Sequence, residues 1–301
     1  MSESAQAEPT PYQWGNSELR DFTALLKPGV MSLVVFSGAI GMWIAPGNLH
    51  PFIQLLTIVC IAMGSGASGA INMWFDRDID AIMHRTQKRP IPSGRMSADN
   101  ALWFGILVAL LSVSLLGLAT NWVAAALLAS AIGFYVFIYT MWLKRSTAQN
   151  IVIGGAAGAF PPVIGWAAVT GSTTLEPWIL FAIIFFWTPP HFWALALYRN
   201  DDYRRANIPM MPVTHGAEYT KKQMLVYTVL LLAITLLPTL LGYSGLLYGC
   251  VAFSLGSYFL LHAWRVYKTD DTKIAMRMFG YSILYLFVLF GFLWLDKWLI
   301  N

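Results

Sequence analysis

The sequence predicts an all-α polytopic membrane protein with nine transmembrane helices. Three observations support this fold class: only 11% of the 301 residues are charged, 57% are hydrophobic, and long apolar runs recur from residue 30 to residue 299. A soluble domain carries roughly 25% charged residues, so a lipid bilayer must cover most of this surface. The 13 Trp, 13 Tyr and 18 Phe residues suit aromatic belts at two membrane interfaces.

The predicted spans follow one another along the chain. A helix needs about 20 apolar residues to cross the hydrocarbon core. Spans are expected at residues 30–46, 52–74, 100–119, 122–142, 150–169, 177–197, 223–242, 245–267 and 275–299. Pro161 and Pro162 predict a kink in the fifth span, which neighbouring helices can accommodate. We expect residues 1–28 to form a cytoplasmic segment and residues 29–301 to form one membrane domain.

The distribution of basic residues predicts the orientation. All of the 19 Lys and Arg residues except Lys297 lie in the N-terminal segment or in the loops after the second, fourth, sixth and eighth spans. The positive-inside rule makes this side cytoplasmic, so the C-terminus is expected in the periplasm. Residues 1–28 have neither the apolar core of a signal peptide nor the composition of a transit peptide. This favours the bacterial inner membrane.

The longest polar loops follow the second and sixth spans, so spans one to four and five to eight look like two halves. Small residues lie near each loop, at 64–70 in the second span and at 154–159 in the fifth. Such residues usually indicate close packing of helices. Room for a flat or long substrate is the alternative interpretation.

Acidic and amide side chains lie at the end of the second span. Asn72, Asp76 and Asp80 are spaced i, i+4 and i+8, so in a continuous helix they share one face with Cβ atoms about 6 Å apart. Stacked carboxylates repel each other unless a cation lies between them, and oxygen ligands of this kind suit Mg²⁺ completed by phosphate oxygens. Asp78 points elsewhere and is expected to be solvated or paired with Arg77.

A basic segment follows directly and contains Arg85, Lys88, Arg89 and Arg95. Prolines and a glycine predict a turn here, which would bring the basic residues to face the carboxylates. Four basic residues in a cytoplasmic loop are by themselves explained by the positive-inside rule. Beside the acidic stripe they predict a diphosphate site, because metal ions and guanidinium groups bind its oxygens together. Lys144, at the end of the fourth span beside Tyr139, is on the same side and can reach that site.

A second cluster follows the sixth span. Tyr198 and Asp202 are four residues apart and are expected to share a helix face, whereas Asp201 and Arg205 share another. His191 lies deeper in the span, where polar groups are often functional. Packing and hydrogen bonding are one interpretation of His191, and contact with a substrate is the other, since imidazole suits haem iron.

These residues resemble the UbiA-type intramembrane prenyltransferases. The first signature of that family is similar to Asn72-x-x-x-Asp76-x-x-x-Asp80 followed by residues 85–90. A narrower likeness, to the branch that farnesylates haem, rests on residues 76–80, 158–166, 189–191 and 202–213 and extends over roughly residues 20 to 295. Position 206 is Ala, so the second acidic motif of the wider superfamily is incomplete and a second full metal triad is not expected.

The resemblance implies a UbiA-type bundle whose active site opens near the cytoplasmic face, with Mg²⁺ as cofactor. It implies farnesyl transfer from farnesyl diphosphate to a vinyl group of haem B, giving haem O for terminal oxidases, with haem A synthase or an oxidase assembly pathway as further partners and no nucleic acid. Catalytic roles are expected for Asp76, Asp80, Arg85, Arg89 and Lys144. Substrate binding is expected for Asn72, Arg85, Lys88, Arg89, Arg95, Tyr139, Lys144, His191, Tyr198 and Arg205. Metal binding is expected for Asn72, Asp76, Asp80 and Asp202.

Two alternatives stay open at this stage. The first is a prenyltransferase of the same architecture that acts on another aromatic or tetrapyrrole acceptor. The second is a membrane transporter, because two similar halves are common among transporters. A transporter should carry its ionisable residues near the middle of the membrane, whereas these acids gather at the ends of two spans.

Overall fold

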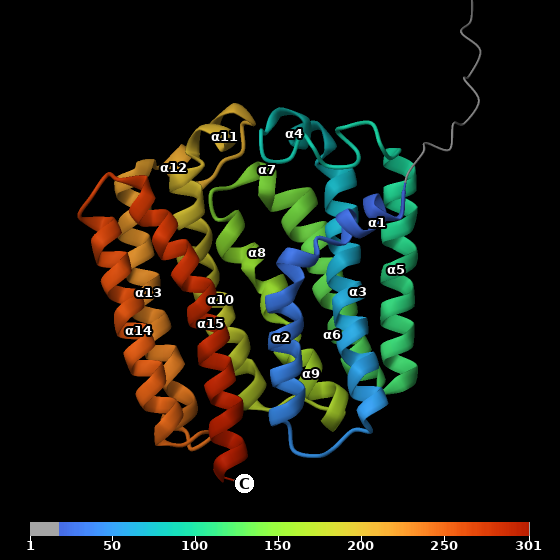
Figure 1. The fold of residues 1–301 in the computed structure, drawn as a ribbon, viewed down its shortest axis with the longest axis vertical. Helices are drawn as coiled ribbons and strands as arrows, with labels where there is room; N and C mark the ends of the chain where they lie inside the picture. Colours follow the sequence, from blue (N-terminus) through green and yellow to red (C-terminus); the bar gives the residue numbers. More distant parts are fainter. Residues whose placement is uncertain (1–17, 301) are drawn as a thin grey trace, which may run out of the picture.

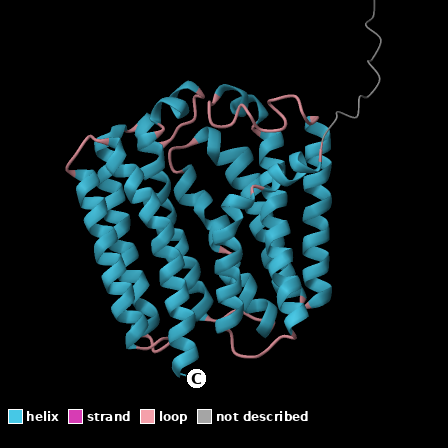
Figure 2. Ribbon diagram, viewed as in Figure 1, coloured by secondary structure: helices cyan, strands magenta, loops and turns pink. Residues whose placement is uncertain are grey.

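The structure is a computed structural model, and it describes residues 18–300. These residues form a bundle of helices with no strand among them (Figure 1, Figure 2). The predicted segment 1–28 lies largely outside the described residues. The helices are α1 (Leu19–Leu26), α2 (Pro28–Ile44), α3 (Pro51–Phe75), α4 (Arg77–Ile82), α5 (Ala98–Ala119), α6 (Trp122–Gly133), the π-helix η1 (Phe134–Leu143), α7 (Lys144–Ser146), α8 (Asn150–Ala159), α9 (Pro161–Thr170), α10 (Leu175–Tyr198), α11 (Asn200–Arg205), α12 (Met211–Thr214), α13 (Gly216–Leu240), α14 (Leu246–Tyr267) and α15 (Thr272–Ile300).

The predicted spans are confirmed in the described part of the chain. Eight helical segments are long and apolar enough to cross a membrane, and Met31–Ile44 within α2 is a shorter apolar helix. One of the eight runs without interruption through α6, η1 and α7, and another combines α8 and α9. At the predicted kink, α8 ends and α9 begins on either side of Phe160, whose backbone angles remain helical (φ −66°, ψ −31°). Pro161 is the first residue of α9. The backbone N–H of a first helical residue makes no hydrogen bond within the helix, so a proline at this position costs nothing.

The spans stand side by side, and short helices cover one end of the bundle. That end, which we call the basic end, carries α4, α7, α11 and α12 (Figure 1). Neighbouring spans in contact include α3 with α5, α2 with α9, and α10 with α13. The contact of α2 with α9 is backbone to backbone, because a β-carbon on Gly165 would lie 2.0 Å from the carbonyl oxygen of Gly38. Only glycine fits at that crossing.

The second half of the bundle holds the largest apolar core. Tyr248, Phe259, Tyr285 and Phe290 are completely buried there between α13, α14, α15 and α10. The burial of large aromatic side chains stabilises the packing of these helices against one another.

Side chains of α15 make polar contacts with α10 and α14 at the end of the bundle opposite the basic end. The Lys297 ammonium lies 2.6 Å from Oε1 of Glu176, near the start of α10, and both side chains are largely buried. The neighbouring Asp296 accepts backbone hydrogen bonds from Gly245 and from Tyr248, the latter at 3.2 Å, and so caps the first turn of α14. The one basic residue predicted on this side is therefore paired with an acid.

Candidate active site

The acidic stripe of the second span is placed where α3 ends and α4 begins, at the basic end. Asp76 is the residue between the two helices, and the N–H of Asp80 donates to the carbonyl oxygen of Asp76 at 2.8 Å. Helical spacing therefore continues past the end of α3. Asn72, Asp76 and Asp80 are 4%, 0% and 2% exposed, so three polar side chains on successive turns are buried at the edge of an apolar bundle.

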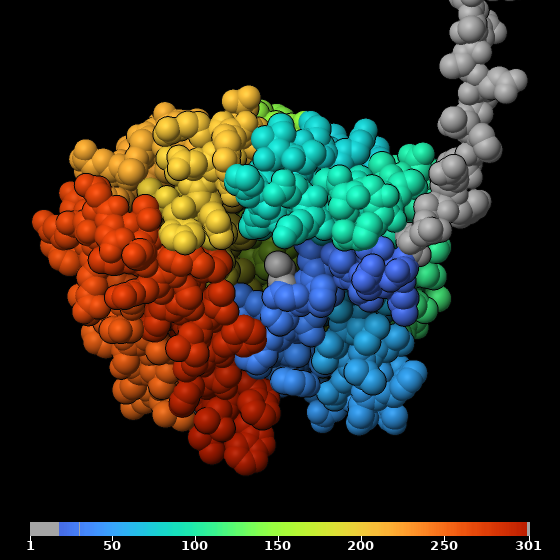
Figure 3. All heavy atoms as spheres, turned by 45° about the horizontal axis from the view of Figure 1, so that its top comes forward, coloured from blue at the N-terminus to red at the C-terminus, as the bar shows by residue number. Residues whose placement is uncertain are grey.

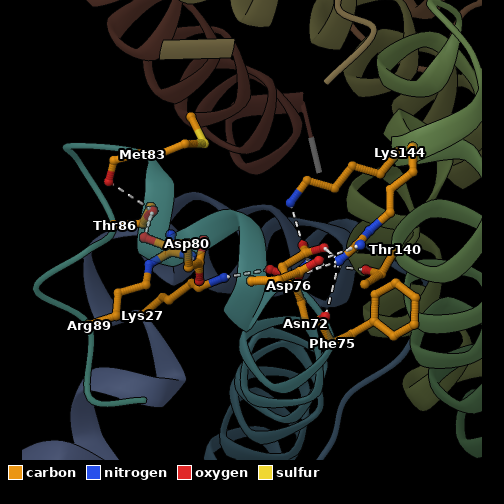
Figure 4. A network of polar contacts seen from close by, with 12 residues as sticks. Lys27, Asn72, Phe75, Asp76, Asp80, Met83, Thr86, Arg89, Thr140 and Lys144 are labelled. Carbon is orange, nitrogen blue, oxygen red and sulfur yellow. Dashed lines mark hydrogen bonds and ion pairs between the residues drawn. The ribbon is translucent and has the colours of Figure 1, made fainter. Parts of the chain in front are cut away.

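Each of the two stacked carboxylates is held by basic side chains (Figure 4). Asp76 pairs with Lys144 and also accepts a hydrogen bond from Asn72 Nδ2 at 2.6 Å. Arg145 reaches the other oxygen of Asp76 at 3.3 Å. Asp80 pairs with Arg89 Nη1 at 2.6 Å. The structure thus brings a buried pair of acids together with basic groups from two other segments.

The helix that carries Lys144 has an unusual backbone. Residues Phe134–Leu143 form the π-helix η1, and such segments are frequent at functional sites. Its Thr140 hydroxyl accepts a hydrogen bond from Asn72 Nδ2 at 3.3 Å, which links η1 to α3. Its Tyr139 ring lies against α8, because a β-carbon on Gly154 would come 2.2 Å from that ring. Sequence reasoning missed the π-helix and Thr140.

Lys27 is a second residue of this site that the sequence did not reveal. It joins α1 to α2, and its Nζ donates to Asn72 Oδ1 at 3.1 Å (Figure 4). Burial, together with the positive charges of Arg89 and Lys144, lowers the pKa of Lys27 to about 7. An anion bound beside this amine would raise its pKa again and favour the charged form.

Several predicted site residues lie elsewhere. Arg95 pairs with Asp21 of α1 at 2.8 Å and donates to a loop carbonyl, so the structure does not bring it to the acids. That contact holds the pKa of the Asp21 carboxyl below its usual range. Arg85 and Lys88 are exposed at the basic end.

Asp78 is exposed, as the solvated alternative predicts, but its ion-pair partner is Arg145 and not Arg77. Arg145 binds both oxygens of Asp78, each at 2.8 Å, whereas Arg77 donates to the carbonyl oxygen of Trp74. The Arg145 guanidinium lowers the pKa of Asp78. Because Arg145 also touches Asp76, it connects the exposed acid to the buried one.

The second acidic cluster lies where α10 ends and α11 begins. A turn at Arg199 separates α10 from α11, and the N–H of Tyr203 donates to the carbonyl oxygen of Arg199 at 3.3 Å, so helical spacing continues here as it does at Asp76. Asp202 is buried and Tyr198 is exposed. Arg205 pairs with Asp202, three residues earlier, and not with Asp201.

His191 lies inside α10, packed between aromatic rings. Its ring centroid is 4.2 Å from that of Trp187 and 4.4 Å from that of Phe279, and both pairs are stacked. Its Nδ1 lies 2.6 Å from Ser282 Oγ on α15. This arrangement fixes the imidazole, as the packing interpretation predicts, and leaves contact with a substrate as a prediction.

The basic end is hollowed between the segments that carry these residues. Figure 3 shows the hollow bordered by the segment around α4, by α11 and α12, by α15 and by the start of α2. The acids of the first cluster belong to α3 and α4, and His191 belongs to α10.

The side chains of the first cluster offer oxygen donors, the ligands that Mg²⁺ prefers. No three His, Cys, Asp or Glu side chains converge on one point within residues 18–300, so there is no all-protein cage. Mg²⁺ does not need one, because it commonly takes one or two carboxylates and completes its shell with phosphate oxygens and water. Asp76 and Asp80 fit that pattern, provided that Lys144 and Arg89 can leave them for an arriving phosphate.

Comparison with known proteins gives one consistent result. The model of the UbiA prenyltransferase family matches residues 34–295. The protein named Protoheme IX farnesyltransferase from Rhodopseudomonas palustris (strain BisB5) is 57% identical over 280 residues, which cover 92% of this chain and 90% of that protein. A protein of the same name from Rickettsia bellii (strain OSU 85-389) is 56% identical, covering 91% of this chain and 92% of the relative.

Solved structures are similar in fold. A digeranylgeranylglyceryl phosphate synthase structure superposes with a TM-score of 0.77 at 18% identity, covering 93% of this chain and 98% of the other. A UbiA homolog from Archaeoglobus fulgidus, solved with DMAPP and Mg²⁺, gives a TM-score of 0.70 at 17% identity, covering 91% of this chain and 99% of the other. At this identity the likeness establishes the arrangement of helices.

Proposed function

The chain belongs to the UbiA prenyltransferase family, and from that premise we propose that it transfers the farnesyl group of farnesyl diphosphate to a vinyl group of haem B, giving haem O. Family membership sets aside the transporter alternative. One observation carries the placement of the reaction: two buried acids, held by basic side chains, lie where α3 meets α4 at the basic end of an apolar bundle. A diphosphate on an isoprenoid tail needs that combination of surfaces.

The acids of the first cluster are proposed to bind the metal ion, and the basic residues are proposed to bind the diphosphate. Asp76 and Asp80 would hold Mg²⁺, with Asn72 and Asp202 as further candidate ligands, and the metal ion would screen the charge of the leaving group. Lys144 and Arg89 would move from their carboxylates to the diphosphate oxygens, since both already lie within reach of the acids. Arg85 and Lys88, exposed at the rim, would strengthen the attraction of the anion.

The reaction itself needs little help from a protein base. The bond between the allylic carbon and the diphosphate oxygen breaks, and the diphosphate leaves with the bonding electrons. The vinyl group of haem B attacks the allylic carbon, and water adds to the resulting porphyrin-side cation and releases a proton. Basic side chains placed before the reaction stabilise the negative charge that grows on the leaving group, while the apolar helices keep stray water from the allylic cation.

The acceptor side of the hollow is assigned to aromatic and polar residues of the later helices. His191, fixed by Ser282 and two rings, is proposed to contact the haem. Tyr139, Tyr198 and Arg205 are proposed as further substrate contacts. The match of family model and relatives over most of the chain supports treating residues 29–301 as one prenyltransferase domain.

We propose that the basic end faces the cytoplasm of a bacterium, with the protein in the inner membrane and its N-terminus inside. The concentration of Lys and Arg at that end supports this orientation. Haem O of this origin would pass to haem A synthase or to a terminal oxidase assembly pathway.

A product assay tests the proposal. Purified protein in detergent micelles is incubated with haem B, farnesyl diphosphate and Mg²⁺, and the haem is analysed by mass. Wild-type protein should produce a haem larger by one farnesyl group and one hydroxyl group, and Asp76→Asn should produce none. Asp99→Asn, which removes an exposed acid from the start of α5, is the matched control and should be active.

Two further arms separate the alternatives. Chelation of Mg²⁺ with EDTA should stop product formation, and added Mg²⁺ should restore it. Supplying 4-hydroxybenzoate in place of haem B should give no prenylated product. A prenylated benzoate without a prenylated haem would refute the acceptor assignment, and full activity of Asp76→Asn would refute the site.

A further inference from the structure

Lys27 stands out among the basic side chains of the acid cluster because it has no acidic partner. Arg89 and Lys144 pair with Asp80 and Asp76, whereas the Lys27 ammonium donates to the neutral amide oxygen of Asn72 at 3.1 Å. Within the described residues no carboxylate oxygen lies within ion-pair distance of Lys27 Nζ. An ammonium carries three donors, so this group retains capacity for an anion.

The backbone around Lys27 is built to send its side chain toward the acids. Lys27 has a φ of +53°, in the left-handed region that non-glycine residues rarely adopt, and it turns the chain from α1 into α2. Its stem passes over Gly69 of α3, where a β-carbon would lie 3.5 Å from Lys27 Cδ and 3.3 Å from the carbonyl oxygen of Leu25. A larger residue than glycine at 69 would crowd this path.

The helix before Lys27 is fastened at both of its ends. Leu25 is completely buried against α3 and α5, and a β-carbon on Gly66 would lie 2.6 Å from Leu26 Cδ2. Asp21 pairs with Arg95 at 2.8 Å. The small residues Gly66 and Gly69 of the second span therefore allow the end of α1 to pack closely against α3. Arg95 holds the start of α1, the helix that ends just before Lys27.

We propose that Lys27 binds a diphosphate oxygen of the prenyl donor directly, and that α1, anchored by Arg95, acts as a strap that positions it. The inference rests on the proposed function, because the diphosphate is its ligand. Lys27 approaches Asn72 from the side of α1 and α2, whereas Lys144 approaches Asp76 from η1 and α7, so an anion on the acids has cations on two sides. Arg95 acts on the substrate through Lys27 and is a positioning residue.

Inorganic pyrophosphate with Mg²⁺ is the probe, and its affinity is measured by titration of the purified protein. Lys27→Gln should weaken pyrophosphate binding about 10- to 100-fold, the loss typical of a hydrogen bond to a charged group. Lys27→Arg should recover most of that loss. Arg20→Gln, which removes an equal charge from the exposed face of α1, should bind as wild type does. Equal weakening by Arg20→Gln, or unchanged binding by Lys27→Gln, would overturn the proposal.

A footprint on the wild-type protein covers the case in which Lys27→Gln does not fold. Acetylation of lysines is followed by mass spectrometry with and without pyrophosphate and Mg²⁺. Lys27 should be protected several-fold, while Lys222, exposed on α13 and paired with Glu218, should react at an unchanged rate. In Arg95→Gln, Lys27 should react faster and be protected less. Equal acetylation of Lys27 with and without pyrophosphate would overturn the proposal.

The two proposals fail in different ways. If wild-type protein forms no prenylated haem but pyrophosphate protects Lys27, the farnesyl transfer is refuted and the anion site is supported. If wild-type protein is active and Lys27→Gln leaves both pyrophosphate affinity and the KM for farnesyl diphosphate unchanged, the role of Lys27 is refuted alone.

Discussion

Replacing Lys144 with Met should destabilise the ligand-free protein, because it removes the principal cation from a carboxylate that is 0% exposed. Removing one partner of a buried ion pair typically costs about 3–5 kcal/mol. Asp76 keeps Arg145 at 3.3 Å and Asn72 at 2.6 Å, so we expect the lower end of that range, about 3 kcal/mol. Asp76→Asn alone should cost less, about 1–2 kcal/mol, because Lys144 can turn toward solvent.

A double-mutant cycle measures the interaction. Unfolding in mixed micelles is followed by tryptophan fluorescence for wild type, Lys144→Met, Asp76→Asn and the double variant. Once Asp76 is replaced by neutral Asn, the loss of Lys144 should cost little further stability. The double variant should therefore lose about 2 kcal/mol less free energy of unfolding than the sum of the two single variants' losses. The exposed pair of Lys222 with Glu218 is the control, with a coupling below about 0.5 kcal/mol. If the losses in free energy of unfolding from Asp76→Asn and Lys144→Met were additive, the interaction of the two side chains would be refuted.

Other predictions concern close contacts and the metal ion. Gly165→Ala places a methyl group 2.0 Å from the Gly38 carbonyl oxygen and should lower the free energy of unfolding by about 1–3 kcal/mol; an unchanged unfolding midpoint would contradict the contact of α2 with α9. In Gly154→Ala the added methyl group would lie 2.2 Å from the Tyr139 ring and displace it. We expect kcat/KM, measured as prenylated haem formed, to fall roughly tenfold or more. Wild-type rates would contradict this prediction. Removal of Mg²⁺ by EDTA should abolish turnover and leave the unfolding midpoint of ligand-free protein unchanged; a lowered midpoint would indicate a structural metal.

The sequence predicted the parts of the molecule that depend on local patterns. Apolar runs of the right length gave all the spans, and Pro161 with Pro162 gave the break between α8 and α9. The spacing of Asn72, Asp76 and Asp80 survived because one backbone hydrogen bond carries the helix past its end. These features need only the chemistry of neighbouring residues.

The features that were missed depend on tertiary placement. Lys27 lies 45 residues from Asn72, and only a left-handed backbone over Gly69 brings the two together. Residues Phe134–Leu143 read as an ordinary apolar helix, since nothing in their composition signals a π-helix. Arg95 was predicted to bind substrate like the other basic residues of its loop, but it forms an ion pair with Asp21. Pairing partners of this kind are decided by packing, which one sequence does not display.

The pairing of Lys297 with Glu176 has a consequence for how the chain is completed. The acid sits at the start of the sixth span, and its partner comes from the last turns of α15. During synthesis, Glu176 enters the membrane long before its lysine exists. A polypeptide stopped just short of position 297 would keep nearly all of its apolar packing and still strand a carboxylate where water is scarce. Small C-terminal truncations should therefore be far more harmful than the few lost contacts suggest.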